Sequence, residues 1–264
     1  MNILSCPFCS AKIKREGNSL ICGGERKHCF DIAKSGYVTL TRAAGSAGDD
    51  RDMVRARTAF LDKGYYLPFA NTVADAVDGA ETVIDAGCGE GYYSNIIASR
   101  GSSVYGFDLS KHACDKAAKR AKALQSGAFF GVSSVYELPI ADGSADALVS
   151  LFAPIAEREF SRVLKDSGLL IVGAAGRNHL YELKKAVYDE AYENEGRRDL
   201  PLGFKEIGRK NVTYTFDCAG EDLKNLFMMT PYAFKTSKSD AAKLDLLTHL
   251  EITADFDIFL FRKC

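Results

Sequence analysis

The sequence lacks a long hydrophobic run and an excess of charge of one sign, and its first residues lead us to expect no leader segment. No apolar stretch approaches the roughly 18 residues of a membrane-spanning helix, and residues 1–10 lack the basic start and apolar run of a signal peptide. The 34 Lys and Arg residues nearly balance the 35 Asp and Glu residues, so binding to nucleic acid would require a local basic patch. We therefore expect a cytoplasmic protein with an ordinary buried core and no membrane partner.

Cysteine is sparse in most of the chain but concentrated at its start, where four of the eight cysteines fall within 29 residues. Disulfides are rare in the cytosol. The cluster therefore indicates a metal site, whereas the scattered cysteines are typical of small core residues. The clustered cysteines are Cys6, Cys9, Cys22 and Cys29, and the scattered ones are Cys88, Cys114, Cys218 and Cys264.

The spacing of the clustered cysteines is typical of a structural zinc site. Cys6 and Cys9 form a C-x2-C pair, and a second pair follows from Cys22 with either His28 or Cys29. Two such pairs complete the tetrahedron that zinc prefers. The fourth ligand stays open, because adjacent residues rarely both bind one ion. The alternatives are four reduced thiols facing solvent, or a redox C-x2-C pair that leaves Cys22 and His28 without a role.

From residue 81 onward, short apolar runs alternate with longer stretches of helical periodicity. This alternation predicts an α/β fold with a parallel sheet covered on both faces. We also expect two helices between residues 53 and 77, one helix at 178–195, and late strands or a hairpin at 249–262. The expected strands are Thr82–Ala86, Ser103–Phe107, Ala128–Val132, Ala145–Leu151 and Leu169–Ala174, and the helices between them are Tyr92–Arg100, Lys111–Leu124 and Ile155–Leu164.

Composition divides the chain into three parts. Residues 1–40 are rich in Cys, Gly and Lys and poor in large apolar residues, which predicts a small metal-held module. Residues 41–80 contain a small, polar stretch at 43–52, which predicts a linker that separates two cores, followed by the two helices. Residues 81–264 form the large α/β domain.

A glycine-rich segment runs from an apolar strand into a helix at residues 83–93. Gly87, Gly89 and Gly91 would let the backbone approach a ligand at the helix N-terminus. Their spacing differs from the G-x-G-x-x-G of dinucleotide binders. Asp85, just before them, disfavours a pyrophosphate and suits a ligand with a cationic amino group. The alternatives are a plain strand-to-helix turn, with glycines for packing, and a nicotinamide enzyme.

Polar residues at the ends of the next two strands complete this pattern. Asp108 ends the second strand, where its carboxylate could accept hydrogen bonds from both ribose hydroxyls of an adenosine. Ser133 or Ser134, after the third strand, is placed near the adenine. Together with the glycine segment, these residues indicate a site for an adenosine carrying a cationic group.

These motifs resemble the 23S rRNA guanine-N1 methyltransferases of the RlmA type, and the resemblance covers nearly the whole chain. No generic methyltransferase would share both the cysteine-rich module and the Phe-Leu-Asp-x-Gly segment. The matching segments are Cys6-Pro-Phe-Cys9, residues 30–38 (FDIAKSGYV), 57–66 (RTAFLDKGYY), 85–93 (DAGCGEGYY), Phe152-Ala-Pro154, Arg177-Asn-His179-Leu and Met229-Thr-Pro231.

The resemblance implies a Rossmann-like class I methyltransferase domain with S-adenosylmethionine as cofactor. It also implies a zinc ribbon that helps to grip RNA, and methyl transfer to N1 of one guanine in a hairpin of 23S rRNA. Residues 41–80 would then complete the cofactor pocket. Carried over position by position, the metal ligands are Cys6, Cys9, Cys22 and His28, and the cofactor contacts are Tyr66, Gly89, Glu90 and His179.

Two departures from the family pattern bear on these residues. The third and fourth metal ligands are two residues further apart than is usual in the family, and one residue is inserted near Ser134. On its own pattern, Tyr66 could simply pack between helices, and His179 could be a helix cap or a surface residue. The resemblance favours cofactor contact for both.

Handling of the guanine would require aromatic and basic residues. An unstacked base could lie against Tyr92, Tyr93 or Phe152, and Phe152-Ala-Pro154 could equally be a simple strand-to-helix turn. The sequence singles out no acceptor for the N1 proton. Basic residues that could contact phosphates are Arg51, Arg55 and Arg57, with Lys12, Lys14, Arg15, Arg26 and Lys27 of the cysteine-rich module.

The sequence leaves open two rival functions and the oligomeric state. A zinc-ribbon RNA-binding protein that only senses a ligand is one rival, which the intact glycine segment disfavours. A methyltransferase acting on another RNA or on a small molecule is a second rival, which only the zinc module disfavours. A homodimer is the third open question.

Overall fold

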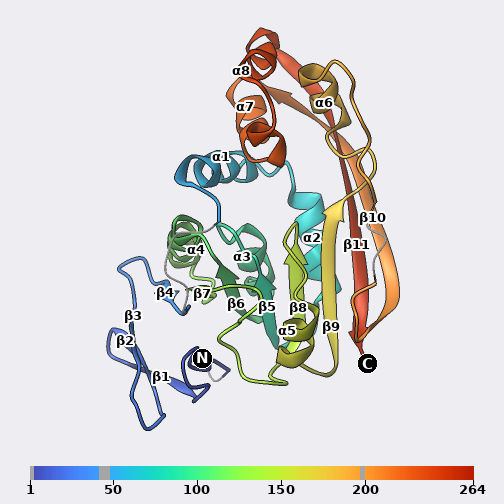
Figure 1. Cartoon of the computed structure of the whole chain (residues 1–264). Coiled ribbons are helices and arrows are strands. Elements are labelled where there is room, and N and C mark those ends of the chain that lie inside the picture. The colour runs from blue at the N-terminus through green and yellow to red at the C-terminus, as the bar shows by residue number, and fades with distance from the viewer. Residues whose placement is uncertain (1–2, 42–47, 197–199) are drawn as a thin grey trace.

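The computed structural model describes residues 3–41, 48–196 and 200–264 and contains two sheets (Figure 1). A small antiparallel sheet has the order β1-β2-β3, and an eight-stranded mixed sheet has the order β10-β11-β9-β8-β5-β6-β7-β4. The small sheet contains β1 (Ile13–Glu16), β2 (Ser19–Cys22) and β3 (Cys29–Asp31). The large sheet contains β4 (Val38–Thr39), β5 (Thr82–Ala86), β6 (Ser103–Asp108), β7 (Phe129–Val132), β8 (Ala145–Leu151), β9 (Leu164–Ala175), β10 (Phe204–Ala219) and β11 (His249–Lys263).

Three of the helices, α1, α4 and α8, begin at a residue whose side chain caps the first turn. Ser110 Oγ accepts a hydrogen bond from Ala113 N at 3.2 Å at the start of α4, and Gln125 in the left-handed conformation ends that helix. Asp50 caps α1 in the same way. The helices are α1 (Arg51–Leu61), α2 (Leu67–Ala76), α3 (Tyr92–Ala98), α4 (Lys111–Leu124), α5 (Glu157–Val163), α6 (Tyr181–Val187), α7 (Glu221–Met228) and α8 (Lys238–Ala241), with 3-10 turns at Pro231–Phe234 and Ala242–Leu246.

The central strands are buried on both faces, which explains their continuous apolar runs. Successive residues point to opposite faces: Val83 and Val149 contribute to one apolar cluster, and Ile84 and Leu148 to another. Strands β5 to β9 pair in parallel, so their carboxyl ends meet at one edge of the sheet. The predicted α/β fold is confirmed, and β5, β8 and α4 have the predicted bounds.

The C-terminal part departs from the expected elements. Residues 249–262 do form a strand, but β11 is one long strand that lies between β9 and the unforeseen β10. The helix expected at 178–195 is wrong beyond α6. The chain reverses there because Nζ of buried Lys184 donates hydrogen bonds to the Tyr192 carbonyl oxygen at 3.0 Å and to Asn194 Oδ1 at 2.6 Å.

The ribbon, which is the segment carrying β1 to β4, is joined to the large sheet. Strand β4 pairs in parallel with β7 at the sheet edge, and Ser5 N donates a hydrogen bond to Pro139 O at 2.9 Å (Figure 1). Leu4 and Leu20 share an apolar cluster with Ile84. The expectation of two separate cores is therefore wrong. Of the predicted linker at 43–52, residues 43–47 lie outside the described part of the chain.

In the described ranges 3–41, 48–196 and 200–264, no helix has both the length and the apolar character that crossing a membrane would require.

Candidate active site

Four side chains of the ribbon converge as a metal-binding group. The ligand atoms of Cys6, Cys9, Cys22 and His28 lie within 4.8 Å of one another. Cys9 Sγ lies 3.7 Å from Cys22 Sγ, and Cys22 Sγ lies 3.4 Å from His28 Nδ1. A zinc tetrahedron with Zn–S bonds of about 2.3 Å has S–S edges of about 3.8 Å. The donors and their separations therefore fit one zinc ion.

The geometry distinguishes between the two candidates for the fourth ligand. His28 directs Nδ1 to the thiols, whereas Cys29 begins β3 and is exposed. Adjacent residues of an extended chain point to opposite sides, which explains why only one of the two joins the group. The His28 amide also donates a hydrogen bond to Cys22 Sγ at 3.1 Å and lowers the pKa of that thiol to about 6, which favours the thiolate that a metal requires. Because Cys6 and Cys22 are buried, the alternative of four solvent-facing thiols does not fit.

A cavity of about 680 Å³ lies at the carboxyl ends of β5, β6, β8 and β9, the usual ligand-binding edge of a parallel sheet. Eight of the nine cofactor residues predicted from the sequence line it, and Gly91 does not. A Cβ on Gly91 would lie 2.8 Å from Ala117 Cβ and 2.9 Å from the Phe130 ring. Gly91 thus serves the packing of α3 against α4 and β7. The eight lining residues are Tyr66, Asp85, Gly87, Gly89, Glu90, Asp108, Ser134 and His179.

The other two glycines allow the close approach that the sequence predicted. Gly87 and Gly89 have φ values of +86° and +53°, which side-chain-bearing residues rarely adopt. A Cβ on Gly87 would lie 2.5 Å from Ala153 Cβ, and one on Gly89 would lie 3.1 Å from Arg57 Nη2. Both glycines line the cavity, and a side chain at either position would meet Ala153 or Arg57.

Two aspartates hold the residues around the loop: Asp108 bonds to the loop backbone, and Asp85 bonds to the helix that follows. Asp85 is buried at the end of β5, where Ser94 Oγ donates a hydrogen bond of 2.5 Å to it, and burial raises the pKa of this carboxyl to about 7. Asp108 accepts hydrogen bonds from Gly89 N at 3.0 Å and Ser110 N at 2.8 Å. Each carboxylate oxygen of Asp108 retains capacity for another donor, because a carboxylate oxygen has two lone pairs. Burial raises the pKa of Asp108 as well.

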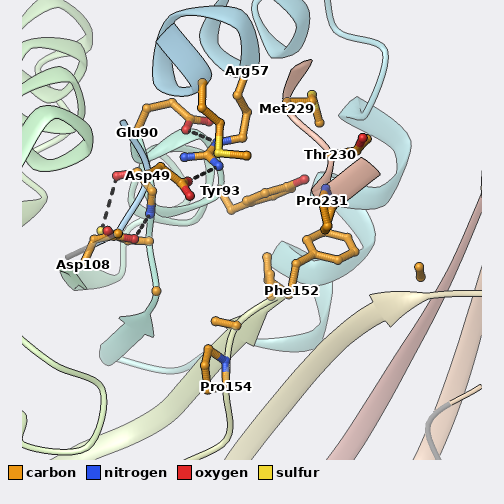
Figure 2. A pocket seen from close by; sticks show the side chains of 18 of the residues that line it. Asp49, Arg57, Glu90, Tyr93, Asp108, Phe152, Pro154, Met229, Thr230 and Pro231 are labelled. Carbon is orange, nitrogen blue, oxygen red and sulfur yellow. Dashed lines mark hydrogen bonds and ion pairs between the residues drawn. The ribbon is translucent and has the colours of Figure 1, made fainter. Parts of the chain in front are cut away.

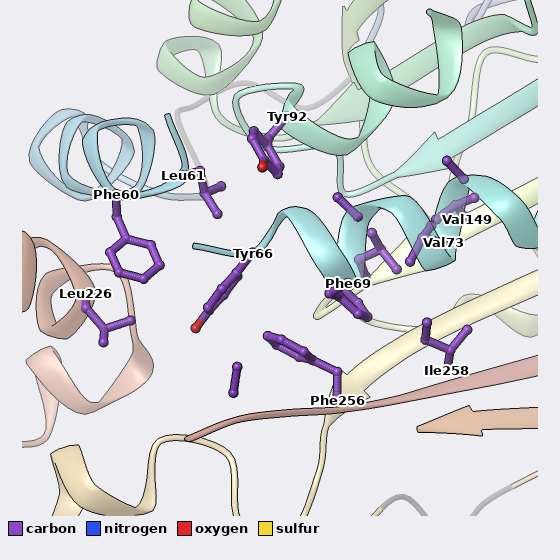
Figure 3. Close-up of a cluster of buried hydrophobic side chains, with 14 of the residues drawn as sticks. Phe60, Leu61, Tyr66, Phe69, Val73, Tyr92, Val149, Leu226, Phe256 and Ile258 are labelled. Atoms are coloured by element: carbon purple, nitrogen blue, oxygen red, sulfur yellow. The ribbon is translucent and has the colours of Figure 1, made fainter. Parts of the chain in front are cut away.

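Tyr66 and His179 meet inside the cavity wall. The Tyr66 hydroxyl lies 3.3 Å from His179 Nε2, and Asp255 N donates a hydrogen bond to His179 Nδ1 at 3.2 Å. Since Nδ1 accepts, this pattern assigns the proton of the neutral ring to Nε2, so that Nε2 donates to Tyr66. Burial lowers the pKa of His179 to about 3. His179 is therefore neither a surface residue nor a helix cap. Figure 3 shows that Tyr66 also packs between Phe60 and Phe256.

Arg57 lies inside this cavity, which the sequence did not indicate. Its Nε donates to Glu90 Oε2 at 2.6 Å and its Nη1 to Asp49 Oδ2 at 2.5 Å (Figure 2). The sequence had suggested that Arg57 contacts phosphates. Its two ion pairs inside the cavity do not fit that role. The other basic residues proposed for phosphate contact are exposed: Arg51, Arg55, Lys12, Lys14, Arg15, Arg26 and Lys27.

The wall opposite the carboxylates is apolar and aromatic (Figure 2). Phe152 and Tyr93 line it, and Phe152 is 50% exposed with a φ of +55°. A left-handed backbone is strained for phenylalanine and is typical of functional sites. Tyr92 does not line the cavity, because its ring lies buried beneath Arg120.

The sequence also missed residues that close the cavity from the C-terminal half. Asn194 and Tyr232 line it, and Asn194 Nδ2 donates hydrogen bonds to the carbonyl oxygens of Gly176, at 2.9 Å, and His179, at 3.0 Å. These contacts depend on the chain reversal after α6, for which the sequence carries no periodic signal. Tyr192 is a further such residue. Met229, Thr230 and Pro231, a segment that the resemblance had singled out without a role, complete this wall.

Comparisons with known proteins agree with this arrangement. A family model described as "RlmA, N-terminal" matches residues 4–42, and one described as "Methyltransferase domain" matches residues 83–168. The 23S rRNA (guanine(748)-N(1))-methyltransferase of Streptomyces fradiae is 32% identical over 254 residues, which cover 91% of this chain and 89% of that protein.

Two further relatives carry names that assign them provisionally to 23S rRNA (guanine-N1) methylation. YxjB of Bacillus subtilis (strain 168) is 28% identical over 99% of this chain and 98% of its own length. A protein of Micromonospora griseorubida is 30% identical over 91% of this chain and 89% of its own length. With the cofactor loop and the metal-binding ribbon in one chain, these matches show that the protein belongs to the family of 23S rRNA (guanine-N1)-methyltransferases.

Proposed function

We propose that this protein transfers a methyl group from S-adenosylmethionine to N1 of a specific guanine in a hairpin of 23S rRNA. The observation that carries the proposal is a single cavity with two unlike walls. One wall is a glycine loop with fixed carboxylates, and the facing wall is aromatic and open to solvent at Phe152. A cationic adenosine compound fits the first wall and a purine fits the second.

The residues on the first wall suit each part of the cofactor. Asp108 would hold the ribose hydroxyls, Ser134 would border the adenine, and Asp85 would face the amino group. Tyr66 would offer its hydroxyl proton, since His179 already donates to its oxygen. When bound, the sulfonium supplies an activated methyl group, so the protein mainly has to align the reactants and exclude water.

The residues on the second wall suit an extruded base. N1 of guanine lies on the pairing edge, so the base must leave its stack before it can react. Phe152 and Tyr93 would stack on it, and Pro154 would limit the depth of the pocket. Stacking on aromatic side chains is how proteins hold unpaired RNA bases.

The ribbon would hold the rRNA. Zinc on Cys6, Cys9, Cys22 and His28 would fix its fold, and its exposed lysines and arginines would contact phosphates. The domain limits of 1–40, 41–80 and 81–264 remain part of this proposal, as do action in the cytoplasm and a homodimer.

The deciding experiment is incubation of unmodified 23S rRNA with radiolabelled cofactor, followed by primer extension. A methyl group on N1 blocks pairing, so we expect label in the RNA and one strong stop at a guanine within a hairpin. Binding of rRNA without label transfer would favour the ligand-sensing RNA-binding protein. Cofactor binding without any label in rRNA would favour a methyltransferase with another substrate.

A further inference from the structure

The charges around the cavity are unevenly divided. Among the described residues that line it, four carry carboxylates, namely Asp49, Asp85, Glu90 and Asp108, and Arg57 is the sole lysine or arginine. Such a cavity favours a ligand whose cationic groups outnumber its anionic ones. Any carboxylate on that ligand would meet repulsion everywhere except beside Arg57.

One nitrogen of the Arg57 guanidinium, Nη2, takes no part in the ion pairs with Glu90 and Asp49. Glu90 engages Nε and Asp49 engages Nη1, while Nη2 is fully buried and has no hydrogen-bond partner in the described part of the chain. A buried donor without an acceptor destabilises a protein, so this nitrogen is suited to a ligand that brings an acceptor. The two carboxylates hold the planar group in place, so Nη2 has a fixed direction.

This nitrogen lies against the glycine loop at Gly89. Nη2 lies 3.1 Å from the position that a Gly89 Cβ would occupy, whereas Cζ and Nε of Arg57 lie 3.6 Å and 3.7 Å from it. Burial alone would lower the pKa of Arg57, but the charges of Glu90 and Asp49 outweigh burial and raise it. The group therefore remains a cation, and its unpaired nitrogen lies beside Gly89 in the cavity wall.

We propose that Arg57 Nη2 binds the α-carboxylate of the amino-acid moiety of the cofactor. This inference rests on the proposed function, because it assumes an adenosyl sulfonium or its thioether product in the cavity. Glu90 and Asp49 are positioning residues for the guanidinium. A phosphate is a poorer occupant, because its second negative charge would lie among the same carboxylates.

The test compares two ligands on the full-length, zinc-loaded protein by calorimetry. One is S-adenosylhomocysteine, and the other is its analogue that lacks only the carboxylate. A charge-assisted hydrogen bond in a buried site corresponds to about 10- to 100-fold in affinity. We expect the native protein to prefer S-adenosylhomocysteine by about this factor. Arg57→Gln should abolish the preference by weakening S-adenosylhomocysteine alone, and Arg57→Lys should retain part of it.

The matched control is Arg55→Gln, an exposed arginine on the same helix, which should keep the native preference. If Arg57→Gln weakens both ligands equally, Arg57 only supports the loop and the inference is wrong. If the native protein shows no preference, the inference fails without any variant. Competition by millimolar inorganic phosphate that disappears in Arg57→Gln would assign the nitrogen to phosphate instead. If the native protein binds neither adenosine ligand, the proposed function itself fails.

Discussion

The Tyr66 hydroxyl lies 3.3 Å from His179 Nε2, although 113 positions separate the two residues in the sequence. Tyr66 precedes α2 and His179 precedes α6, so the contact joins the N-terminal helices to the C-terminal half of the chain at the cavity. The tyrosine ring packs in the core while its hydroxyl faces His179. One side chain thus belongs both to the core and to the candidate site.

Removing the Tyr66 hydroxyl should separate the contribution of the ring to the core from the contribution of the hydroxyl to ligand binding. We expect Tyr66→Phe to weaken S-adenosylhomocysteine binding by about 3- to 10-fold, the usual value of one neutral hydrogen bond. The fold should be retained, because the ring still packs against Phe60 and Phe256, although the unpaired His179 Nε2–H should lower the thermal midpoint modestly. Calorimetry measures the affinity. The adjacent Tyr65→Phe, which loses only a bond to Asp222, should leave the affinity unchanged. A collapse of the fold in Tyr66→Phe would contradict this division.

The depressed pKa of His179 should make stability depend on pH. Its folded-state pKa of about 3 lies below the value of about 6.5 expected in an unfolded chain. The neutral ring therefore stabilises the fold fully above pH 6.5 or so, and this contribution is lost as the pH falls towards 3. Urea denaturation at pH 7 and pH 5 should show a smaller loss of stability for His179→Gln than for the native protein. The exposed His249→Gln should behave as native, and equal losses in all three proteins would refute the assignment.

Two glycines of the same loop should respond differently to alanine. Gly89→Ala places a methyl group 3.1 Å from Arg57 Nη2 at a φ of +53°, so we expect a loss of cofactor affinity of at least about 10-fold. Gly91→Ala presses on Ala117 and Phe130 instead, and should lower the free energy of unfolding by about 1–3 kcal/mol. Calorimetry and denaturant unfolding of both variants decide between these outcomes. A reversed pattern would show that Gly91, not Gly89, borders the ligand.

Elemental analysis should find one zinc per chain after purification without chelator. His28→Ala should lose the metal, whereas the neighbouring Cys29→Ser should keep it, because Cys29 lies outside the ligand group. The ribbon shares an apolar cluster with the large sheet, so loss of zinc should also lower the thermal midpoint of the whole chain. An unchanged midpoint in metal-free protein would show that the ribbon folds independently.

Phe152 should act on the base without affecting the cofactor. Stacking of one base on an aromatic ring contributes about 1–3 kcal/mol, so Phe152→Ala should reduce methylation of limiting rRNA by about 5- to 100-fold. The affinity for S-adenosylhomocysteine should remain within a factor of about two. The matched variant Phe152→Tyr keeps the ring and should retain most of the activity. If Phe152→Ala loses cofactor affinity to the same extent as activity, the ring contacts the cofactor and not the base.

The sequence predicted the elements whose signal is local and periodic. The strand at Thr82–Ala86 and the helix at Lys111–Leu124 have the expected bounds, because apolar runs and a capping serine mark them. Strand β10 was missed because its first half is largely exposed and charged, and only its second half has an apolar face, on which Val212, Tyr214 and Phe216 pack against the main apolar cluster. The choice between His28 and Cys29 required the direction of each side chain, which spacing alone does not supply.

The environment of Arg57 could not be read from sequence for a related reason. An arginine on the first helix resembles any solvated or phosphate-binding arginine until Glu90, 33 positions away, is brought against it. Pairings of this kind arise from the approach of two elements, and no local pattern encodes them.

Through the pairing of β4 with β7, the ribbon covers what would otherwise be an exposed edge strand of the large sheet. Without residues 38 and 39, the backbone amides and carbonyls of β7 that now pair with β4 would be free to recruit a strand from another molecule. A catalytic fragment beginning at residue 41 would therefore tend to self-associate, and its light scattering would rise with concentration whether or not RNA is present. In this chain, the segment proposed to hold the RNA would then also protect the edge of the large sheet from pairing with another molecule.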